Sequence, residues 1–324
     1  MKVSVLIPVY GVEKFLDVFL KSLCAQTLID CEFIVVNDAS PDNSHDIIIK
    51  YLEVDSRFKY INKKLNQGEM QARQDAFKLA TGDFIINIDS DDYISPGFLK
   101  GLYELAIDNN LEMVLSNVIS VDEDGRPIDS EYRVFKDDFL FNKDNLKRAL
   151  SLPYSSWSRM TKKSVLDKYN YSFLQGETSL TRLQFTGDLR SGFSSTSIYF
   201  YRQRLGSLSS FENSSKKYSA SYGCMKIDEI YNGDTLVNNG EGFSHEFKLF
   251  RFINMSKLIF LSNLNNGSTL NYIKEISYLK SKYSVSYLKT FFLLFHFPLK
   301  TKVFSIILYL GLSPLLLLLK KVKK

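Results

Sequence analysis

The stretch Phe84-Ile85-Ile86-Asn87-Ile88-Asp89-Ser90-Asp91-Asp92 joins a short apolar run directly to a cluster of carboxylates. Its isoleucine-rich first half is typical of a strand that is buried on both faces of a parallel sheet. Similar runs lie at residues 3–7, 32–36 and 112–119. The sequence therefore predicts a mainly parallel sheet, with carboxylates at the carboxyl end of one strand.

Helical patterns separate these runs. Apolar residues recur at helical spacing between Phe15 and Leu23, and a second helix is expected to follow Ser44. A third is predicted from about residue 67 to 80, with Gly82 adopting the left-handed conformation that often ends a helix. A fourth is predicted to have Ser95 as its N-cap and Pro96 at its first position.

Strands that alternate with helices indicate an α/β fold with right-handed crossovers. Ligands of such folds bind in a crevice at the carboxyl ends of the strands. Three polar motifs follow predicted strands at that edge: Pro8-Val9-Tyr10-Gly11, Asn37-Asp38-Ala39-Ser40 and Asp89-Ser90-Asp91-Asp92. We expect them to lie around one crevice.

The bulk composition excludes several classes of protein. In 324 residues, 45% are hydrophobic and 24% are charged, which excludes a disordered chain and argues against a polytopic membrane protein. The net charge of +5 is modest and its basic residues gather near the C-terminus, so nucleic acid is not an expected partner. Three cysteines without a CxxC pair favour a reducing compartment.

The pattern divides the chain into four predicted parts. Residues 1–120 are expected to form the α/β half that carries the crevice motifs, 121–215 an irregular substrate-facing half of loops and short helices, and 216–290 a helical extension. The last part, 291–324, contains the apolar run 303–319 flanked by lysines. We expect it to lie in or span a membrane, with the lysines on anionic lipid at the cytoplasmic face. The alternative is a helix pair packed on the protein's own core.

The carboxylates at 89–92 suit a hard cation. Side chains alternate along a strand, so Asp89 and Asp91 are expected to face one ligand while Ser90 points elsewhere. Carboxylates this close repel each other unless a cation or hydrogen bonds compensate them. Carboxylate oxygens suit Mg²⁺ or Mn²⁺, which neutralise the charge of a diphosphate. A solvated acidic turn ahead of the next helix is the alternative.

Two further polar residues have open interpretations. Asp38 could accept hydrogen bonds from a nucleobase or ribose, or it could form a local turn ahead of the second helix. Arg73 could reach a base or a diphosphate from the third helix, or it could be an ordinary exposed arginine. Trp157 is interpreted as a packing residue, although an aromatic ring can also stack on a sugar.

The motifs together resemble a known family. Val5-Leu6-Ile7-Pro8-Val9-Tyr10-Gly11, Asn37 to Asp42, Asn66 to Arg73 and Asp89 to Asp92 occur in the order and spacing of the inverting glycosyltransferases of the GT-A fold, the bacterial family called family two. The resemblance covers residues 1–120 closely. It extends loosely over 150–210, where the segment Tyr199 to Ser207 resembles an arginine-containing segment that closes the catalytic domain.

The resemblance implies a uracil and ribose site formed by Pro8, Tyr10, Asp38 and Arg73. It places Asp89 near the ribose or the metal and Asp91 on Mg²⁺ or Mn²⁺. It also implies a nucleotide-sugar donor, most simply a UDP-sugar, and a saccharide or lipid-linked glycan acceptor. The sugar is transferred with inversion by single displacement in such enzymes.

The catalytic base is the point at which this chain departs from the family. A Glu-Asp pair is expected about 90 residues after the metal motif, but the chain has Glu177-Thr178 there. We take Glu177 as the candidate base, with Asp188 as an alternative. The same departure leaves open a second function, a catalytically impaired nucleotide-sugar-binding subunit of a glycan assembly complex.

A third hypothesis, a nicotinamide-dependent dehydrogenase, is excluded by the residues that follow the first predicted strand. No GxGxxG sequence follows the first strand, where Pro8-Val9-Tyr10-Gly11-Val12-Glu13 stands instead.

Overall fold

The computed structural model describes residues 1–128, 134–142, 145, 148, 152, 156–173 and 189–204. The chain divides into two compact units, of which the first comprises residues 1–145, 152–184 and 189–203. Every helix and strand given below lies in this first unit. Almost all of the second unit, residues 146–151, 185–188 and 204–324, lies outside the described residues, and with it the predicted helical extension and tail.

The first half of the sheet is parallel, as the sequence predicts. Its strands run in the order β3-β2-β1-β4 and are β1 (Val3–Val9), β2 (Cys31–Asn37), β3 (Phe58–Asn62) and β4 (Phe84–Asn87). Every residue of β1, β2 and β4 is buried, which is why these strands are almost purely apolar. The edge strand β3 is only partly buried and was not predicted, because its Lys and Asn interrupt the apolar run.

The second half of the sheet is mixed. It contains β5 (Tyr93–Ile94), β6 (Met113–Val121), β7 (Phe139–Leu140), β8 (Arg159–Lys162) and β9 (Ser191–Arg202). β8 is antiparallel to both β4 and β6, whereas the long β9 is parallel to β6. The prediction of loops and short helices is therefore wrong for residues 191–202, which form β9. The strand was missed because its buried serines at 191, 194 and 197 interrupt the apolar pattern that predicts a buried strand.

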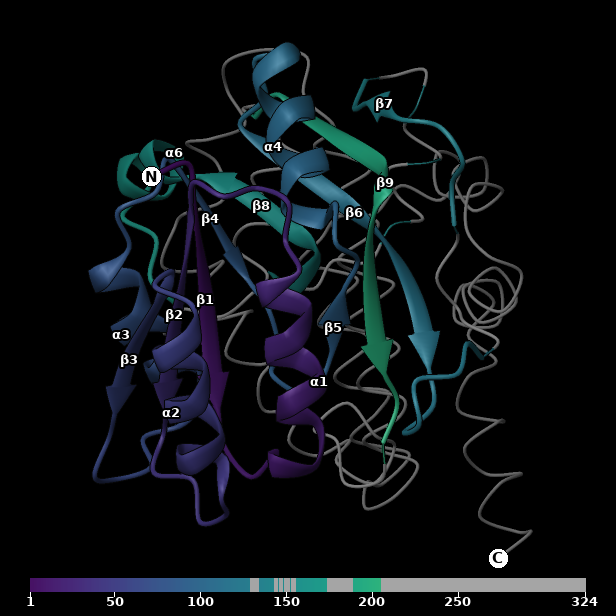
Figure 1. The fold of residues 1–324 in the computed structure, drawn as a ribbon. Coiled ribbons are helices and arrows are strands. Elements are labelled where there is room, and N and C mark those ends of the chain that lie inside the picture. Colours follow the sequence, from purple (N-terminus) through teal and green to yellow (C-terminus); the bar gives the residue numbers. More distant parts are fainter. Residues whose placement is uncertain are drawn as a thin grey trace, which may run out of the picture. The chain divides into compact units, whose positions relative to one another are not determined.

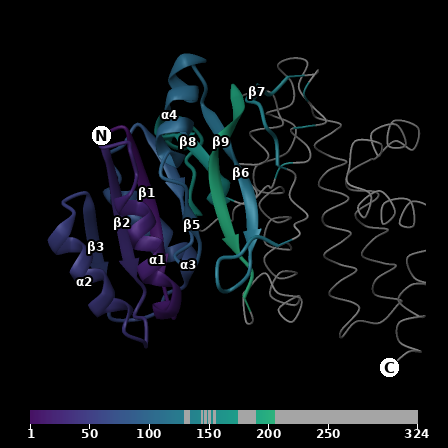
Figure 2. The same ribbon diagram turned by 45° about the vertical axis from the view of Figure 1, so that its right-hand side comes forward.

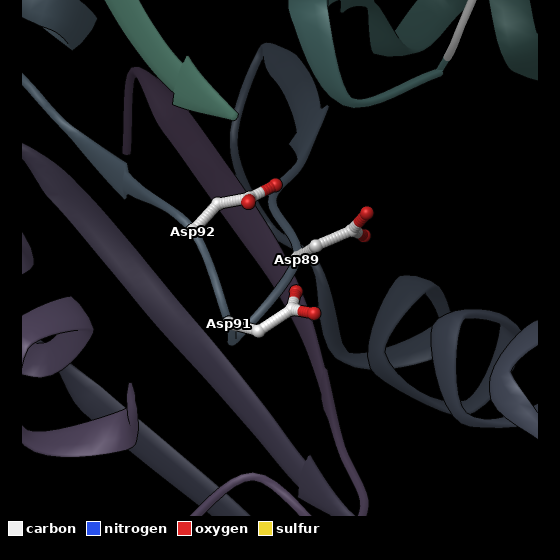
Figure 3. A group of neighbouring side chains, drawn as sticks. All are labelled: Asp89, Asp91 and Asp92. Carbon is white, nitrogen blue, oxygen red and sulfur yellow. The ribbon is translucent and has the colours of Figure 1, made fainter. Parts of the chain in front are cut away.

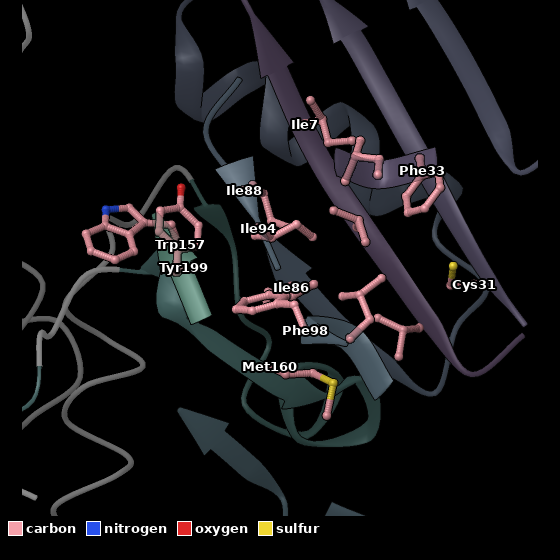
Figure 4. Packing of buried hydrophobic residues seen from close by; sticks show 14 of the residues in the cluster. Ile7, Cys31, Phe33, Ile86, Ile88, Ile94, Phe98, Trp157, Met160 and Tyr199 are labelled. Carbon is pink, nitrogen blue, oxygen red and sulfur yellow. The ribbon is translucent and has the colours of Figure 1, made fainter. Parts of the chain in front are cut away.

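Helices cover both faces of the sheet (Figure 1). The helices on one face are α1 (Glu13–Cys24), α2 (Ser44–Val54) and α4 (Phe98–Asp108), and those on the other are α3 (Glu69–Leu79) and the short α6 (Lys163–Lys168). The turned view in Figure 2 shows the parallel strands β1–β3 at one side of this unit and β6 with β9 at the other. Figure 4 shows the hydrophobic core between the sheet and helices α1, α2 and α4, in which Ile7, Phe33 and Phe98 are buried.

Two helix ends differ from the prediction. Helix α4 begins at Phe98 with Gly97 as its N-cap, because Ser95 is instead paired with Ile198 of β9 through both its N–H and its hydroxyl. Helix α3 ends with Ala80 in an extended conformation, and Gly82 does not adopt the left-handed conformation. A Cβ at Gly82 would lie 2.6 Å from the backbone nitrogen of Ser4, so close packing explains this glycine.

None of the helices in the described part of the chain is long and apolar enough to cross a bilayer. The apolar run 303–319 lies outside that part, so its membrane role stays a prediction.

Candidate active site

The polar motifs meet at the carboxyl edge of the parallel strands. β1 is paired with β2 on one side and with β4 on the other, and Val9, the last residue of β1, lies opposite Asn37, the last residue of β2. The residues that follow these strands are Tyr10, Asp38 and the turn Asp89–Asp92. The predicted crevice edge therefore brings together residues that are up to about eighty positions apart in the sequence.

Three carboxylates form a cluster at the end of β4 (Figure 3). One oxygen from each of Asp89, Asp91 and Asp92 lies within 4.8 Å of the others. Asp89 and Asp91 are partly exposed, whereas Asp92 is buried. Ser90 points away, as expected, and donates a hydrogen bond to the carbonyl oxygen of Pro8 (2.7 Å). The grouping comes from a turn and not from strand alternation, because the N–H of Asp92 donates to the carbonyl oxygen of Asp89 (3.2 Å) and the Asp92 side chain joins the cluster.

The buried Asp92 has both oxygens engaged by β9. The hydroxyl of Tyr199 donates to Oδ2 (2.6 Å), and the backbone N–H of Arg202 donates to Oδ1 (2.7 Å). Burial, followed by the charges of Asp91 and Asp89, raises the pKa of Asp92 well above its ordinary value, although these two hydrogen bonds act in the opposite direction. Asp92 therefore shapes the turn from inside, while Asp89 and Asp91 reach the surface.

This donor set fits a hard divalent cation. Carboxylate oxygens on partly exposed side chains leave room for water and phosphate oxygens, which Mg²⁺ usually keeps among its ligands. Asp91 and Asp89 would hold the ion. Bound there, it would neutralise negative charge on a diphosphate.

Arg73 is buried beside this cluster. Its side chain has no exposed surface, and its Nη2 atom forms ion pairs with Asp89 and with Glu69 one helical turn earlier on α3. The interpretation of Arg73 as an exposed arginine is therefore wrong, because the polar partner Asp89 comes from another element. A fixed positive charge thus lies directly behind the carboxylates.

Asp38 lies at the end of β2 and holds the start of α3. Its side chain is 2% exposed, and its carboxylate accepts hydrogen bonds from the backbone N–H groups of Gln67 (3.1 Å) and Gly68 (2.7 Å). Lys63 also forms an ion pair with it, at 2.7 Å. Gly68 has a φ of +91°, which favours glycine, and it is the N-cap of α3. Asp38 thus fixes the helix that carries Arg73.

Tyr10 and Pro8 occupy different environments. The Tyr10 side chain is 52% exposed just beyond β1, whereas Pro8 is buried within the strand and offers only its carbonyl, to Ser90. Gly11 follows with a φ of +65° and donates its N–H to the hydroxyl of Ser40, which joins the loops after β1 and β2. An exposed aromatic ring on a fixed turn is suited to stack on a flat ligand.

Sequence reasoning missed the roles of Lys63 and Tyr199. Lys63 directly follows β3, so recognition of that strand would have placed it at the crevice edge. Tyr199 lies in β9, and an aromatic residue in a strand is usually interpreted as part of the hydrophobic core. The candidate base Glu177, its neighbour Thr178 and the alternative Asp188 lie outside the described residues.

A family model described as Glycosyl transferase family 2 matches residues 4–170 of the chain. The chain belongs to this family. The match covers all but the first residue of the parallel half of the sheet, the carboxylate turn and β8, so the predicted family is confirmed.

The chain also resembles individual proteins. The EpsH protein of Bacillus subtilis (strain 168) is 33% identical over 218 residues, which cover 64% of this chain and 62% of EpsH. The chain thus spans less than two thirds of that relative. Crystal structures of S. aureus TarS residues 1-349 show the same fold. The complex with UDP has a TM-score of 0.60 and is 21% identical, with 83% of this chain and 75% of the TarS chain covered. The complex with UDP-GlcNAc has a TM-score of 0.61 and is 19% identical, with 93% of this chain and 83% of the TarS chain covered.

Proposed function

We propose that this chain is an inverting glycosyltransferase that transfers a sugar from a UDP-sugar to a saccharide or lipid-linked glycan in cell-surface polysaccharide synthesis. The observation that carries the proposal is the pair Asp89 and Asp91, which stands at the carboxyl edge of the sheet with the buried charge of Arg73 behind it. A diphosphate with a divalent cation complements this arrangement. The TarS structures of the same fold contain UDP and UDP-GlcNAc.

Each site residue has a proposed part in donor binding. The exposed ring of Tyr10 stacks on the uracil, and the Pro8 carbonyl supports the adjoining turn through Ser90. Asp38 and Arg73 support the uracil and ribose site from beneath its surface, Asp38 by holding the start of α3 and Arg73 by its ion pair with Asp89. Asp91, together with Asp89, holds Mg²⁺ or Mn²⁺ against the diphosphate.

The transfer itself is a single displacement. The acceptor hydroxyl oxygen forms a bond to the anomeric carbon as the bond from that carbon to the diphosphate oxygen breaks, and UDP leaves with the electron pair. The proton of the hydroxyl passes to a carboxylate, for which we propose Glu177. Thr178 at the neighbouring position, where the family pattern has aspartate, supports the alternative of a subunit that binds the donor without turnover.

A calorimetric titration tests donor binding. UDP is titrated with and without Mn²⁺ into the wild type, Asp91→Ala and the control Asp108→Ala, whose exposed carboxylate lies at the last residue of α4. We expect Mn²⁺ to strengthen UDP binding in the wild type and in the control but not in Asp91→Ala. Absence of UDP binding in the wild type would overturn the proposal.

Donor hydrolysis on the same samples separates the two functions. Release of sugar from one UDP-sugar, reduced in Glu177→Gln, supports the transferase. Tight UDP binding without turnover of any UDP-sugar, also in the presence of saccharide acceptors, favours the binding subunit.

For the C-terminal part we propose attachment to the cytoplasmic face of the membrane through residues 291–324. The support is the apolar run 303–319 between lysines. In a vesicle flotation experiment the full chain should float with vesicles that contain anionic lipid, and truncation after residue 290 should abolish flotation. Equal flotation of the truncated chain would contradict this proposal.

A further inference from the structure

Residues of strand β9 form hydrogen bonds with both ends of the carboxylate turn, which comprises Asp89 to Asp92. The Tyr199 hydroxyl donates to Asp92 Oδ2 (2.6 Å) and accepts a hydrogen bond from the backbone N–H of Asp89 (3.2 Å). Three positions further on, Arg202 donates its backbone N–H to Asp92 and its Nε–H to the carbonyl oxygen of Asp91 (2.9 Å). The first and the last residue of the turn therefore share one hydroxyl group.

Aromatic packing fixes that hydroxyl in place. The Tyr199 side chain has no exposed surface, and its ring stacks on Trp157 with 4.6 Å between ring centroids and 24° between planes (Figure 4). Trp157 is itself stacked on Tyr201, at 5.3 Å and 7°. Phe98 of α4 packs on Tyr199 from another element, at 6.2 Å. The ring therefore cannot swing away from the turn without disrupting this stack.

The turn needs such support because three carboxylates repel one another within it. A metal site binds tightly when its ligands are already held in place before the ion arrives, and hydrogen-bonded neighbours of the ligands supply that order. Tyr199 binds the backbone N–H of Asp89 and the side chain of the buried Asp92, and it has no exposed surface through which it could reach an ion in solvent. It is therefore placed to order the ligands without being one.

We propose that Tyr199 is a positioning residue for the metal turn, and that its hydroxyl sets the spacing at which Asp89 and Asp91 face one divalent cation. The proposal rests on the proposed function, because it requires an ion at these carboxylates. It assigns a function in metal binding to β9, which lies about a hundred residues after the ligands.

The test removes only the hydroxyl group. Tyr199→Phe keeps the stacked ring, and Tyr51→Phe is a matched control, since the Tyr51 hydroxyl also donates to a carboxylate, Asp17 Oδ1 (2.7 Å), at a site between α1 and α2. The affinity for Mn²⁺ in the presence of UDP is measured by electron paramagnetic resonance. We expect Tyr199→Phe to weaken it by about tenfold, as loss of a partner of a metal ligand typically does, and Tyr51→Phe to leave it unchanged.

A second readout uses Trp157, the single tryptophan of the chain. Binding of Mg²⁺ with UDP should change the emission of Trp157 through the stacked Tyr199 ring, and Tyr199→Phe should reduce that change. The affinity for UDP without metal should be the same in all three proteins, because a merely structural loss would weaken it as well. If Tyr199→Phe does not stay folded, Trp157→Phe, which loosens the stack but keeps the hydroxyl, should show the weaker Mn²⁺ binding.

A Mn²⁺ affinity of Tyr199→Phe equal to that of the wild type would overturn the proposal and leave the proposed function intact. An equal loss of affinity in Tyr51→Phe would overturn it too, because the effect would then be general. If the wild type with UDP binds no Mn²⁺, the metal part of the proposed function fails, and this inference fails with it.

Discussion

The ion pair between Arg73 and Asp89 has one partner inside the protein and the other at its surface. The Arg73 side chain has no exposed surface, whereas 26% of the Asp89 side chain is exposed. A buried guanidinium depends on its carboxylate partners, Asp89 and Glu69, because they replace the water it has lost. The pair therefore links the stability of α3 to the geometry of the carboxylate turn.

Arg73→Gln should lower the free energy of unfolding by about 1.5–3 kcal/mol, because it removes hydrogen bonds to charged groups while the carboxylates left behind, Asp89 and Glu69, are partly exposed to water. The matched control is Arg126→Gln, because Arg126 pairs with Asp124 while 75% of its side chain is exposed. That pair should contribute less than about 1 kcal/mol. Urea denaturation of both variants measures the difference. Equal losses would show that the burial of Arg73 does not matter for stability.

The sequence predicted the strands and turns of the crevice because their signals are local. The apolar run before Asp89 and the polar residue after it are neighbours in the chain. The burial of Arg73 could not be predicted in this way, since Asp89 approaches it from a different element. Gly82 was misread for a similar reason: its constraint comes from Ser4, which lies on the adjoining strand. The role of Tyr199 depends on the pairing of β9 with β6, which buried serines concealed.

Stability should depend on pH through Glu32, which is 1% exposed. Burial alone would raise the pKa of Glu32, but hydrogen bonds from Lys59, Ser4 and Thr81 together hold it below its ordinary value. A lowered pKa means that this stabilisation is fully present above the pKa of an unfolded glutamate, about 4.3, and is lost as the pH falls through the lower folded value.

Glu32→Gln should therefore be less stable than the wild type at pH 7 by about 1.5–3 kcal/mol, the range for hydrogen bonds to a charged group. The difference should shrink as the pH falls below about 4. Chemical denaturation of both proteins at a series of pH values checks this. A difference that stays constant down to the acid limit would show that the charge of Glu32 makes no contribution.

The close approach of Gly82 to β1 should make this glycine sensitive to substitution. In Gly82→Ala the new Cβ would meet the backbone nitrogen of Ser4 at 2.6 Å, and backbone cannot move aside as a flexible side chain can. The hydrogen bond from the Gly82 N–H to Ser4 Oγ (2.8 Å) would be strained as well. We expect the free energy of unfolding to fall by about 1–3 kcal/mol or more.

Gly97→Ala is the control, since no atom lies within 4 Å of its added Cβ. Thermal unfolding should separate the two variants clearly, and equal melting temperatures would contradict the packing explanation.

The start of α1 and the start of α2 hold each other. Asp42 Oδ2 accepts the backbone N–H of Glu13 (2.9 Å), and Glu13 Oε2 accepts the backbone N–H of Asn43 (2.7 Å). Neither helix has a side-chain cap from its own N-cap residue, so each carboxylate satisfies a donor of the other helix.

Asp42→Ala should lower the free energy of unfolding by about 1–2 kcal/mol, as loss of an N-cap does, and so should Glu13→Ala. Because both bonds close the same junction, the double variant should lose about 0.5–1 kcal/mol less than the sum of the two single losses. Urea denaturation of the four proteins gives this coupling energy. Strict additivity would mean that the two helix ends are stabilised independently.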